Sequence, residues 1–326
     1  MADDAQLWAT PTEEDARRIL SEITGQPVCD LRRFSNGLAH FVYDVKLADG
    51  QNLVVRLTRP AQQPDFAGAV YWSELLRPLG VPLPAVIHAE LDHHVYGFPV
   101  LVLERLPGVD LGDCYTSLSN DQKREIARLI VDVQRCAATL PTGRGYGYAS
   151  SPDDPSLRPT WRDVLDASLR RSREWIHTAG EMDDDVVDRV EREVDQFNAH
   201  FERVEPTCFL HDTTTKNVMV HEGRLSGIVD VDSVCYGDPL WVLALTNMAL
   251  RSMGGDQVYV DAWVDELDLS DEARTAMALY TSMHCVAFLG EIGQRFNKDV
   301  APPVDHAYRR RLESVLGELL DEVRGE

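Results

Sequence analysis

Residues 208–232 read CFLHDTTTKNVMVHEGRLSGIVDVD, and they give the clearest indication of the fold. Asp212 and Asn217 stand five residues apart before one apolar run, and Asp230 ends a second run after a short turn. A hairpin of this form would bring the three side chains together. The set suits phosphoryl transfer, in which one Asp accepts the proton of a hydroxyl while Asn and the second Asp hold Mg²⁺ against the phosphates. Either Asp alone is more simply a turn or cap residue.

The chain before this stretch has the pattern of a small antiparallel sheet with helices. Thr12 and Gly25 bracket a predicted helix, because Thr is a good helix cap and Gly a common helix end. Asp49-Gly50 is typical of a tight turn between two strands. The predicted strands are Phe34–Val45, Leu53–Leu57, Ala85–Ala89 and Phe98–Leu103, with a helix at Ala67–Leu79. Beyond residue 106 the periodicity is helical, with a β-like island at residues 208–234.

The motifs in the island, taken in order, resemble a known family. His211-Asp212, Asn217, Asp230 and then Gly237-Asp238-Pro239 are similar to the aminoglycoside phosphotransferase family of small-molecule kinases, which shares the protein-kinase fold. The resemblance covers about residues 30 to 245. It implies an α+β, two-lobed fold: an N-terminal antiparallel-sheet lobe with one main helix at residues 1–105, a hinge at about 102–107, and a larger, mostly helical C-terminal lobe at 106–326.

The resemblance also implies roles for residues along the chain. Asp212 would be the catalytic base, Asn217 and Asp230 the Mg²⁺ ligands, and Arg56 the cation that pairs with the phosphates of ATP or GTP. Lys216 is a candidate to reach the γ-phosphate, or equally a solvated loop side chain. The remaining nucleotide-binding positions are Ser35, Asn36 and Gly37 in the covering loop, Glu74 as the helix partner of Arg56, and Leu103, Glu104 and Leu106 in the hinge.

Several positions depart from the family pattern. The family usually has His two residues before the catalytic Asp, whereas this chain has Leu210 there and His211 next to the Asp. If the usual His braces the loop, another group must do so here, or His211 does so from a different direction. Arg56 replaces the more usual Lys, which keeps the charge but changes the hydrogen-bonding fork. Val242 stands where many relatives carry an Asp.

Composition excludes several classes of protein. The 326 residues are 44% hydrophobic, enough for a large core, and the net charge is −22. Such a charge argues against binding nucleic acid or an anionic membrane surface. The six cysteines form no C-x-x-C pair, and no run is apolar enough to span a membrane, so we expect a cytoplasmic protein.

The leading hypothesis is a phosphotransferase that moves the γ-phosphoryl group of ATP or GTP to a hydroxyl of a small molecule, an aminoglycoside-like antibiotic or a metabolite alcohol. Residues 106–326 hold 40 acids and 23 bases, a net charge of −17, which favours a neutral or cationic acceptor. Candidate acceptor-lining residues are Asp232, Trp161, Trp175 and Glu291. The alternatives are a catalytically silent nucleotide-binding regulator and a nucleotide-sugar transferase that uses Asp230 and Asp232. The sequence leaves the oligomeric state open.

Overall fold

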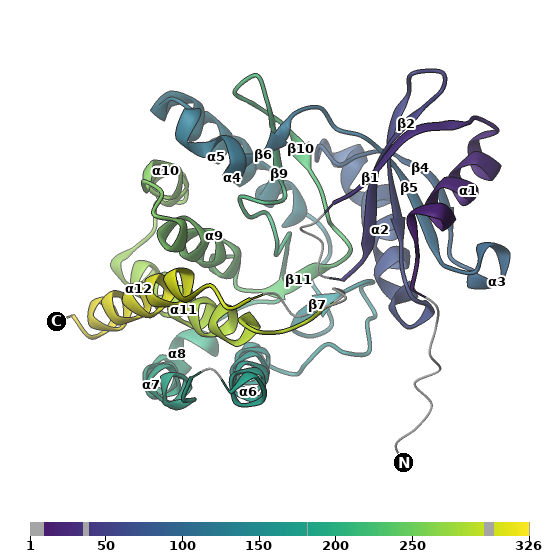
Figure 1. The fold of residues 1–326 in the computed structure, drawn as a ribbon. Helices are drawn as coiled ribbons and strands as arrows, with labels where there is room; N and C mark the ends of the chain where they lie inside the picture. Colours follow the sequence, from purple (N-terminus) through teal and green to yellow (C-terminus); the bar gives the residue numbers. More distant parts are fainter. Residues whose placement is uncertain (1–9, 35–38, 181, 297–302, 326) are drawn as a thin grey trace, which may run out of the picture.

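The computed structural model describes residues 10–34, 39–180, 182–296 and 303–325. Its N-terminal part is built on a five-stranded antiparallel sheet (Figure 1). In spatial order the strands are β1 (Val28–Arg33), β2 (Phe41–Leu47), β3 (Asn52–Leu57), β5 (Val100–Glu104) and β4 (Val86–Glu90). The turn after β2 contains Asp49 and Gly50, as the sequence predicts. The predicted covering-loop residues Ser35, Asn36 and Gly37 lie outside the described residues.

The two faces of this sheet have different environments. On one face Tyr43, Val55 and Val102 pack in a core with α1 (Glu13–Thr24). Thr12 and Asp15 form a capping box at the start of α1, and Gly25 ends the helix in the left-handed conformation. Because side chains alternate along a strand, the neighbouring positions Arg56 and Leu101 face the other side, where α2 lies.

Helix α2 (Gln63–Leu76) is the main helix on that second face, and a 3₁₀ turn at Arg77–Leu79 continues it to Gly80. The helix passes very close to the C-terminal part of the molecule. A methyl group added at Gly68 would lie 2.0 Å from the backbone oxygen of Asp232 and 2.8 Å from Cβ of Ser150. Glycine at this position therefore lets α2 rest directly on the segment that follows Asp230.

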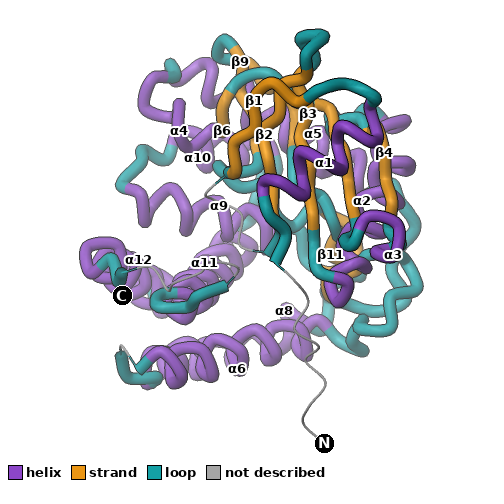
Figure 2. Tube along the Cα trace, turned by 45° about the vertical axis from the view of Figure 1, so that its right-hand side comes forward, coloured by secondary structure: helices purple, strands orange, loops and turns teal. Residues whose placement is uncertain are grey.

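The remainder of the chain is mostly helical and contains two small sheets (Figure 2). The sheets join β10 (Arg224–Ile228), β9 (Val218–His221) and β6 (Val109–Asp110), and β7 (Gly147–Ala149), β11 (Val234–Gly237) and β8 (Thr207–Phe209). Helix α3 (His93–Tyr96) belongs to the N-terminal part, between β4 and β5. The helices of the remainder are α4 (Leu111–Cys114), α5 (Asn120–Ala137), α6 (Trp161–Ala179), α7 (Asp185–Val194), α8 (Asn198–Phe201), α9 (Leu240–Met253), α10 (Val258–Glu266), α11 (Asp271–Glu291) and α12 (His306–Arg324).

This architecture confirms the predicted two-lobed α+β fold. The N-terminal sheet has its own core around α1, and a larger core joins α5, α6, α9, α11 and α12 in the helical lobe. The division of the chain near residue 105 stays a prediction. Within the described ranges, no helix combines the length and apolar character needed to cross a bilayer.

Candidate active site

The loop between β8 and β9 carries Asp212, and local hydrogen bonds hold it. Oγ1 of Thr214 donates to Oδ1 of Asp212 over 3.2 Å. Nδ2 of Asn217 donates to the backbone oxygen of Asp212 over 3.0 Å. The backbone N–H groups of Asn217 and Val218 both donate to the oxygen of Thr214, which closes the loop as a tight turn. The loop thus fixes Asp212 and Asn217 relative to each other.

The β9–β10 hairpin brings Asp230 to the same place. Its last ladder pair joins Val218 and Ile228, and the N–H of Val229 donates to the oxygen of Asn217 over 2.9 Å. Asp230 follows directly, in the left-handed region at φ 65°, an uncommon conformation for a residue other than glycine. The strand pairing therefore places Asn217 and Asp230 at the open end of one hairpin.

The side-chain oxygen atoms at this end of the hairpin are suitable ligands for a magnesium ion. Asn217 uses its amide N–H inside the loop, so its side-chain oxygen is the atom that it can offer. The Asp230 carboxylate is half-exposed, and one of its oxygens contacts Arg56 at 2.9 Å. Carboxylate and amide oxygens are the ligands that Mg²⁺ prefers in proteins. Asn217 and Asp230 therefore remain the predicted residues for holding that ion.

Burial sets the protonation of Asp212. The pKa of Asp212 is raised to about 7, first because the loop removes its carboxyl from water and second because of the negative charge of Asp230. Hydrogen bonds from Thr214 and Asn217 and the charge of Lys216 act in the opposite direction. A carboxylate with a pKa near neutrality can both take up and release a proton, which suits a general base.

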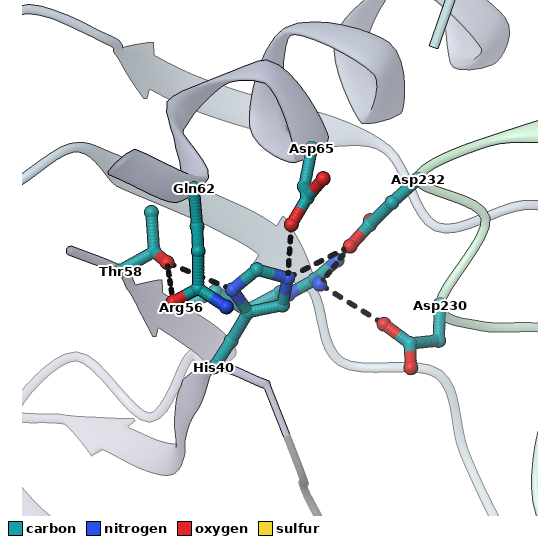
Figure 3. A network of polar contacts seen from close by, with 7 residues as sticks. All are labelled: His40, Arg56, Thr58, Gln62, Asp65, Asp230 and Asp232. Atoms are coloured by element: carbon teal, nitrogen blue, oxygen red, sulfur yellow. Dashed lines mark hydrogen bonds and ion pairs between the residues drawn. The ribbon is translucent and has the colours of Figure 1, made fainter. Parts of the chain in front are cut away.

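Arg56 on β3 is the buried cation of the site, with 4% of its surface exposed. Its guanidinium donates to both carboxylate oxygens of Asp232 at 2.6 and 2.5 Å and also contacts Asp230 (Figure 3). It lies 5.2 Å from the centre of the Phe66 ring. Burial alone would lower the pKa of Arg56, but Asp232 and Asp230 outweigh this effect and raise it. Arg56 is thus permanently charged and already engaged by two carboxylates.

His40 and Asp65 complete this network, and neither was singled out by the sequence analysis. The His40 ring contacts Oγ1 of Thr58 at 2.9 Å, Asp232 at 3.1 Å and Asp65 at 3.6 Å (Figure 3). Burial would raise the pKa of Asp232, yet Arg56 and His40 together hold it below its usual range. No local motif signals His40 or Asp65, because their partner Asp232 is more than 160 residues away in the chain.

The prediction that Glu74 holds Arg56 is wrong in this structure. Glu74 is exposed, and the acidic side chain that α2 turns toward the network is Asp65. The reason is helical phase: nine residues at 100° each place Glu74 half a turn away from Asp65. Phe66 and Ala69 lie on the buried face with Asp65, whereas Glu74 lies on the outer face.

The candidate acceptor residues separate into two groups. Trp161 belongs to the core of the helical lobe, since it is 1% exposed and its Nε1 donates to the Tyr280 hydroxyl over 2.9 Å. Asp232 faces the N-terminal lobe through Arg56 and His40. Their prediction as acceptor-lining residues is therefore wrong in this structure. Trp175 is partly exposed, with the Arg171 guanidinium 5.4 Å from its ring centre.

Glu291, at the end of α11, lies near two cations. Burial raises the pKa of Glu291, and the charges of Lys216 and Arg171 act against this rise. Lys216 is exposed, and its charge acts on Asp212 as well. Lys216 is therefore electrostatically linked both to the predicted base and to Glu291, and the catalytic and acceptor roles of these side chains stay predictions.

One of the predicted hinge positions contributes to a cavity that Arg56 also lines. Leu103 lines it together with Leu101, Ile228 and Asp230. Glu104 pairs with Ala85, both through its own N–H and through its carboxylate, which accepts the Ala85 N–H over 3.0 Å. The carbonyl of Leu106 accepts from the Arg105 guanidinium over 2.7 Å. Contact between these positions and a nucleotide base stays a prediction.

The chain belongs to the phosphotransferase enzyme family, whose model, abbreviated APH, matches residues 30–280. This confirms the resemblance seen in the sequence. A search of curated proteins finds no match.

Solved structures of similar fold include two aminoglycoside phosphotransferases. A thermostable mutant of aminoglycoside phosphotransferase APH(4)-Ia, in complex with AMP-PNP and hygromycin B, has 18% identity and a TM-score of 0.68, with 96% of this chain and 99% of that chain covered. An aminoglycoside 2'-phosphotransferase IIIa mutant with GDP has 12% identity and a TM-score of 0.67, with 96% and 97% covered.

A third similar structure is a putative fructosamine-3-kinase from Thermobifida fusca. It has 16% identity and a TM-score of 0.59, and the match covers 95% of this chain and 98% of that chain. At these identities the three likenesses concern the fold.

Proposed function

We propose that this protein transfers the γ-phosphoryl group of ATP or GTP to a hydroxyl group of a small molecule. The observation that carries the proposal is the position of Asp212, Asn217 and Asp230 at the open end of one hairpin, opposite the buried cation Arg56. Family membership supports the same reaction class. The nucleotide-sugar transferase alternative loses its basis, because the Asp232 carboxylate is bound by Arg56 and His40.

In the proposed reaction Asp212 accepts the proton of the acceptor hydroxyl while the hydroxyl oxygen attacks the γ-phosphorus. The bond from phosphorus to the bridging oxygen breaks, and the nucleoside diphosphate leaves. Asn217 and Asp230 would hold Mg²⁺, which when bound neutralises charge on the phosphates. Arg56 would bind phosphate oxygens, and the transition state, whose charge is spread over oxygen atoms, gains most from such fixed cations.

The acceptor would lie on the helical lobe beside Asp212. Lys216, Glu291 and Trp175 are the proposed residues near it. The charges of Lys216 and Arg171 both act on Glu291, and the Arg171 guanidinium lies over the Trp175 ring. The net charge of −17 on residues 106–326 favours a neutral or cationic acceptor over an anionic one. The similar structure that contains hygromycin B makes an aminoglycoside a reasonable first compound to test.

The test is Mg²⁺-dependent phosphoryl transfer by the wild-type chain and by Asp212→Ala. A coupled assay of nucleotide consumption would screen aminoglycosides, ketosamines and other hydroxylated metabolites with ATP and with GTP. We expect acceptor-dependent turnover by the wild type and a loss of roughly 10³-fold or more in Asp212→Ala, since that variant lacks the base.

Calorimetry of nucleotide binding provides the control, because Asp212→Ala should bind nucleotide as the wild type does. Wild-type turnover in Asp212→Ala would contradict the proposal. Tight nucleotide binding without transfer to any compound would instead favour a silent regulatory module.

A further inference from the structure

Gln134 lies in the last turn of α5, far from the catalytic loop in sequence, yet its side chain reaches that loop. Only 8% of the residue is exposed. Its Oε1 accepts the backbone N–H of Leu210 over 2.9 Å. Its Nε2 donates to the backbone oxygen of Leu210 over 2.9 Å and to Oγ1 of Thr213 over 2.9 Å. One carboxamide thus makes three hydrogen bonds to the loop that carries Asp212.

The pattern of donors and acceptors allows one orientation of this amide. The backbone N–H of Leu210 needs an acceptor, and its carbonyl needs a donor, so Oε1 and Nε2 cannot be exchanged. The two contacted residues stand on either side of Asp212, two positions before it and one position after it. Gln134 therefore holds the Leu210 backbone on one side of the segment that presents the carboxylate and the Thr213 hydroxyl on the other.

Helix α5, which carries Gln134, is rigid. Ser119 and Gln122 form a capping box at the start of α5, and Ile130, Val131 and Ala137 on the same helix are fully buried in the core of the helical lobe. Buried side chains in a close-packed core keep one conformation, and so does a group held by three hydrogen bonds. The position of α5 is thereby passed on to the loop.

The side chains of Leu210 and His211 do not make these contacts, and His211 hydrogen-bonds to the backbone of Ser233 instead. Leu210 is apolar and 1% exposed, so its side chain cannot hold backbone polar groups. The His211 ring lies edge-on against Tyr148 at 4.8 Å between ring centres. Within the described residues, the buried Nδ1 of His211 has no hydrogen-bond partner. The hydrogen bonds that hold this loop at Leu210 and Thr213, which we call the brace, come from a different element, α5.

We infer that Gln134 is a positioning residue for phosphoryl transfer, which sets the place and direction of the Asp212 carboxylate through Leu210 and Thr213. This inference rests on the proposed function for its catalytic consequence, but not for the brace itself. Misplacing a reacting group by about 1 Å can cost on the order of 100-fold in rate. Loss of the brace should therefore lower kcat and leave nucleotide binding unchanged, because Gln134 contacts the loop backbone and the Thr213 hydroxyl.

Two variants test the brace, and both nearly keep the shape of the side chain. Gln134→Met removes all three hydrogen bonds. Gln134→Glu keeps an acceptor for the Leu210 N–H but loses both donors, and it serves if the Met variant does not fold. The matched control is Asn247→Leu, which removes another buried hydrogen bond of the helical lobe, from Asn247 to Thr281 over 3.2 Å.

The first readout needs no activity. Hydrogen exchange of the Leu210 amide, followed by mass spectrometry of peptides covering residues 206–218, should be roughly tenfold or more faster in Gln134→Met and unchanged in Asn247→Leu. The second readout is slow transfer from Mg²⁺–ATP to water, where kcat should fall about 10- to 100-fold in Gln134→Met at an unchanged KM for ATP.

Unchanged exchange of the Leu210 amide, or a kcat within twofold of the wild type in a folded Gln134 variant, would overturn the inference. An equal loss of kcat in Asn247→Leu would also overturn it, since the effect would then come from stability alone. If the wild-type chain neither binds nor hydrolyses Mg²⁺–ATP or Mg²⁺–GTP, the proposed function fails, and the exchange measurement still decides whether Gln134 holds the loop.

Discussion

His284 shows at the scale of one residue how burial decides the chemistry of an ionisable side chain. It lies on α11, 5% exposed, with its ring 4.0 Å from the Trp241 ring. Its Nε2–H donates to the backbone oxygen of Trp241 over 3.0 Å. Burial lowers the pKa of His284 from 6.5 to about 3. The folded protein therefore holds this ring neutral at pH values where an unfolded chain would protonate it.

The consequence is a loss of stability in acid. Between about pH 6.5 and pH 3 the unfolded chain binds a proton at residue 284 and the folded chain does not, so the free energy of unfolding falls as the pH falls. One such proton contributes about 1.4 kcal/mol for each pH unit. We expect His284→Gln, which keeps a donor for Trp241, to reduce the slope of stability against pH by up to this amount.

Urea denaturation at pH 7.5, 6, 5 and 4.5 measures this slope for the wild type and for the variant. His177→Gln, at an exposed position on α6, is the control for the exchange of a histidine for a glutamine. Identical slopes for wild type and His284→Gln would show that His284 does not titrate in this way.

A site residue can be predicted from the sequence when its partners lie close to it along the chain. Asp212, Asn217 and Asp230 could be placed from the sequence, because one hairpin with a short turn joins them. The partner of Arg56 could not, because Asp232 reaches it from 176 residues away. Glu74 failed on helical phase, and Gln134 carries no signal at all, since a polar residue in an amphipathic helix is ordinarily exposed.

At the scale of elements, the contact between α2 and the segment after Asp230 predicts that replacing a helical glycine by alanine lowers the stability of the protein, which is the opposite of the usual effect. Replacing a glycine inside a helix by alanine ordinarily stabilises the helix by about 1 kcal/mol. At Gly68 the added methyl group would lie 2.0 Å from the backbone oxygen of Asp232, so α2 or that segment must move. We expect Gly68→Ala to destabilise the protein by about 1–3 kcal/mol and to weaken nucleotide binding.

Gly317→Ala on α12 is the matched control, because no atom lies within 4 Å of its added methyl group. It should stabilise the protein by up to about 1 kcal/mol and leave nucleotide binding unchanged. Chemical denaturation and calorimetry with ADP measure both variants. Equal stability changes in the two would mean that the close approach at Gly68 carries no cost.

Most elements could be predicted from local signals, and the exceptions depend on tertiary contacts. Thr12 and Gly25 fix the ends of α1 as expected, and Asp49-Gly50 marks the β2–β3 hairpin. The helix predicted at Ala67–Leu79 begins four residues earlier, at Gln63. Strand β7 arises inside a loop rich in Pro, Gly and Ser, because Val234 and Cys235 on β11 offer it a partner. No periodicity in residues 141–159 could reveal that pairing.

At the scale of the whole molecule, ion pairs and hydrogen bonds from Arg56 and His40 join the two lobes at Asp232. A buried cation that loses one carboxylate partner commonly costs a protein about 3–5 kcal/mol. In the proposed reaction the Asp232 carboxylate would compete with phosphate for Arg56. A nucleotide that binds Arg56 would have to displace this carboxylate or share the guanidinium with it, so the contact between the lobes and the proposed nucleotide binding would depend on the same group.

Asp232→Asn separates these two effects. We expect the variant to be less stable by about 3 kcal/mol, and to bind ADP without Mg²⁺ about tenfold more tightly, because a negative charge next to the phosphate position is removed. Asp256→Asn is the control: it takes a carboxylate from another buried cation, Lys123, within the helical lobe, and should cost stability without changing ADP affinity. Calorimetry in EDTA and urea denaturation measure both quantities. Equal or weaker ADP binding by Asp232→Asn would show that Asp232 does not compete with phosphate, and that Arg56 serves the contact between the lobes alone.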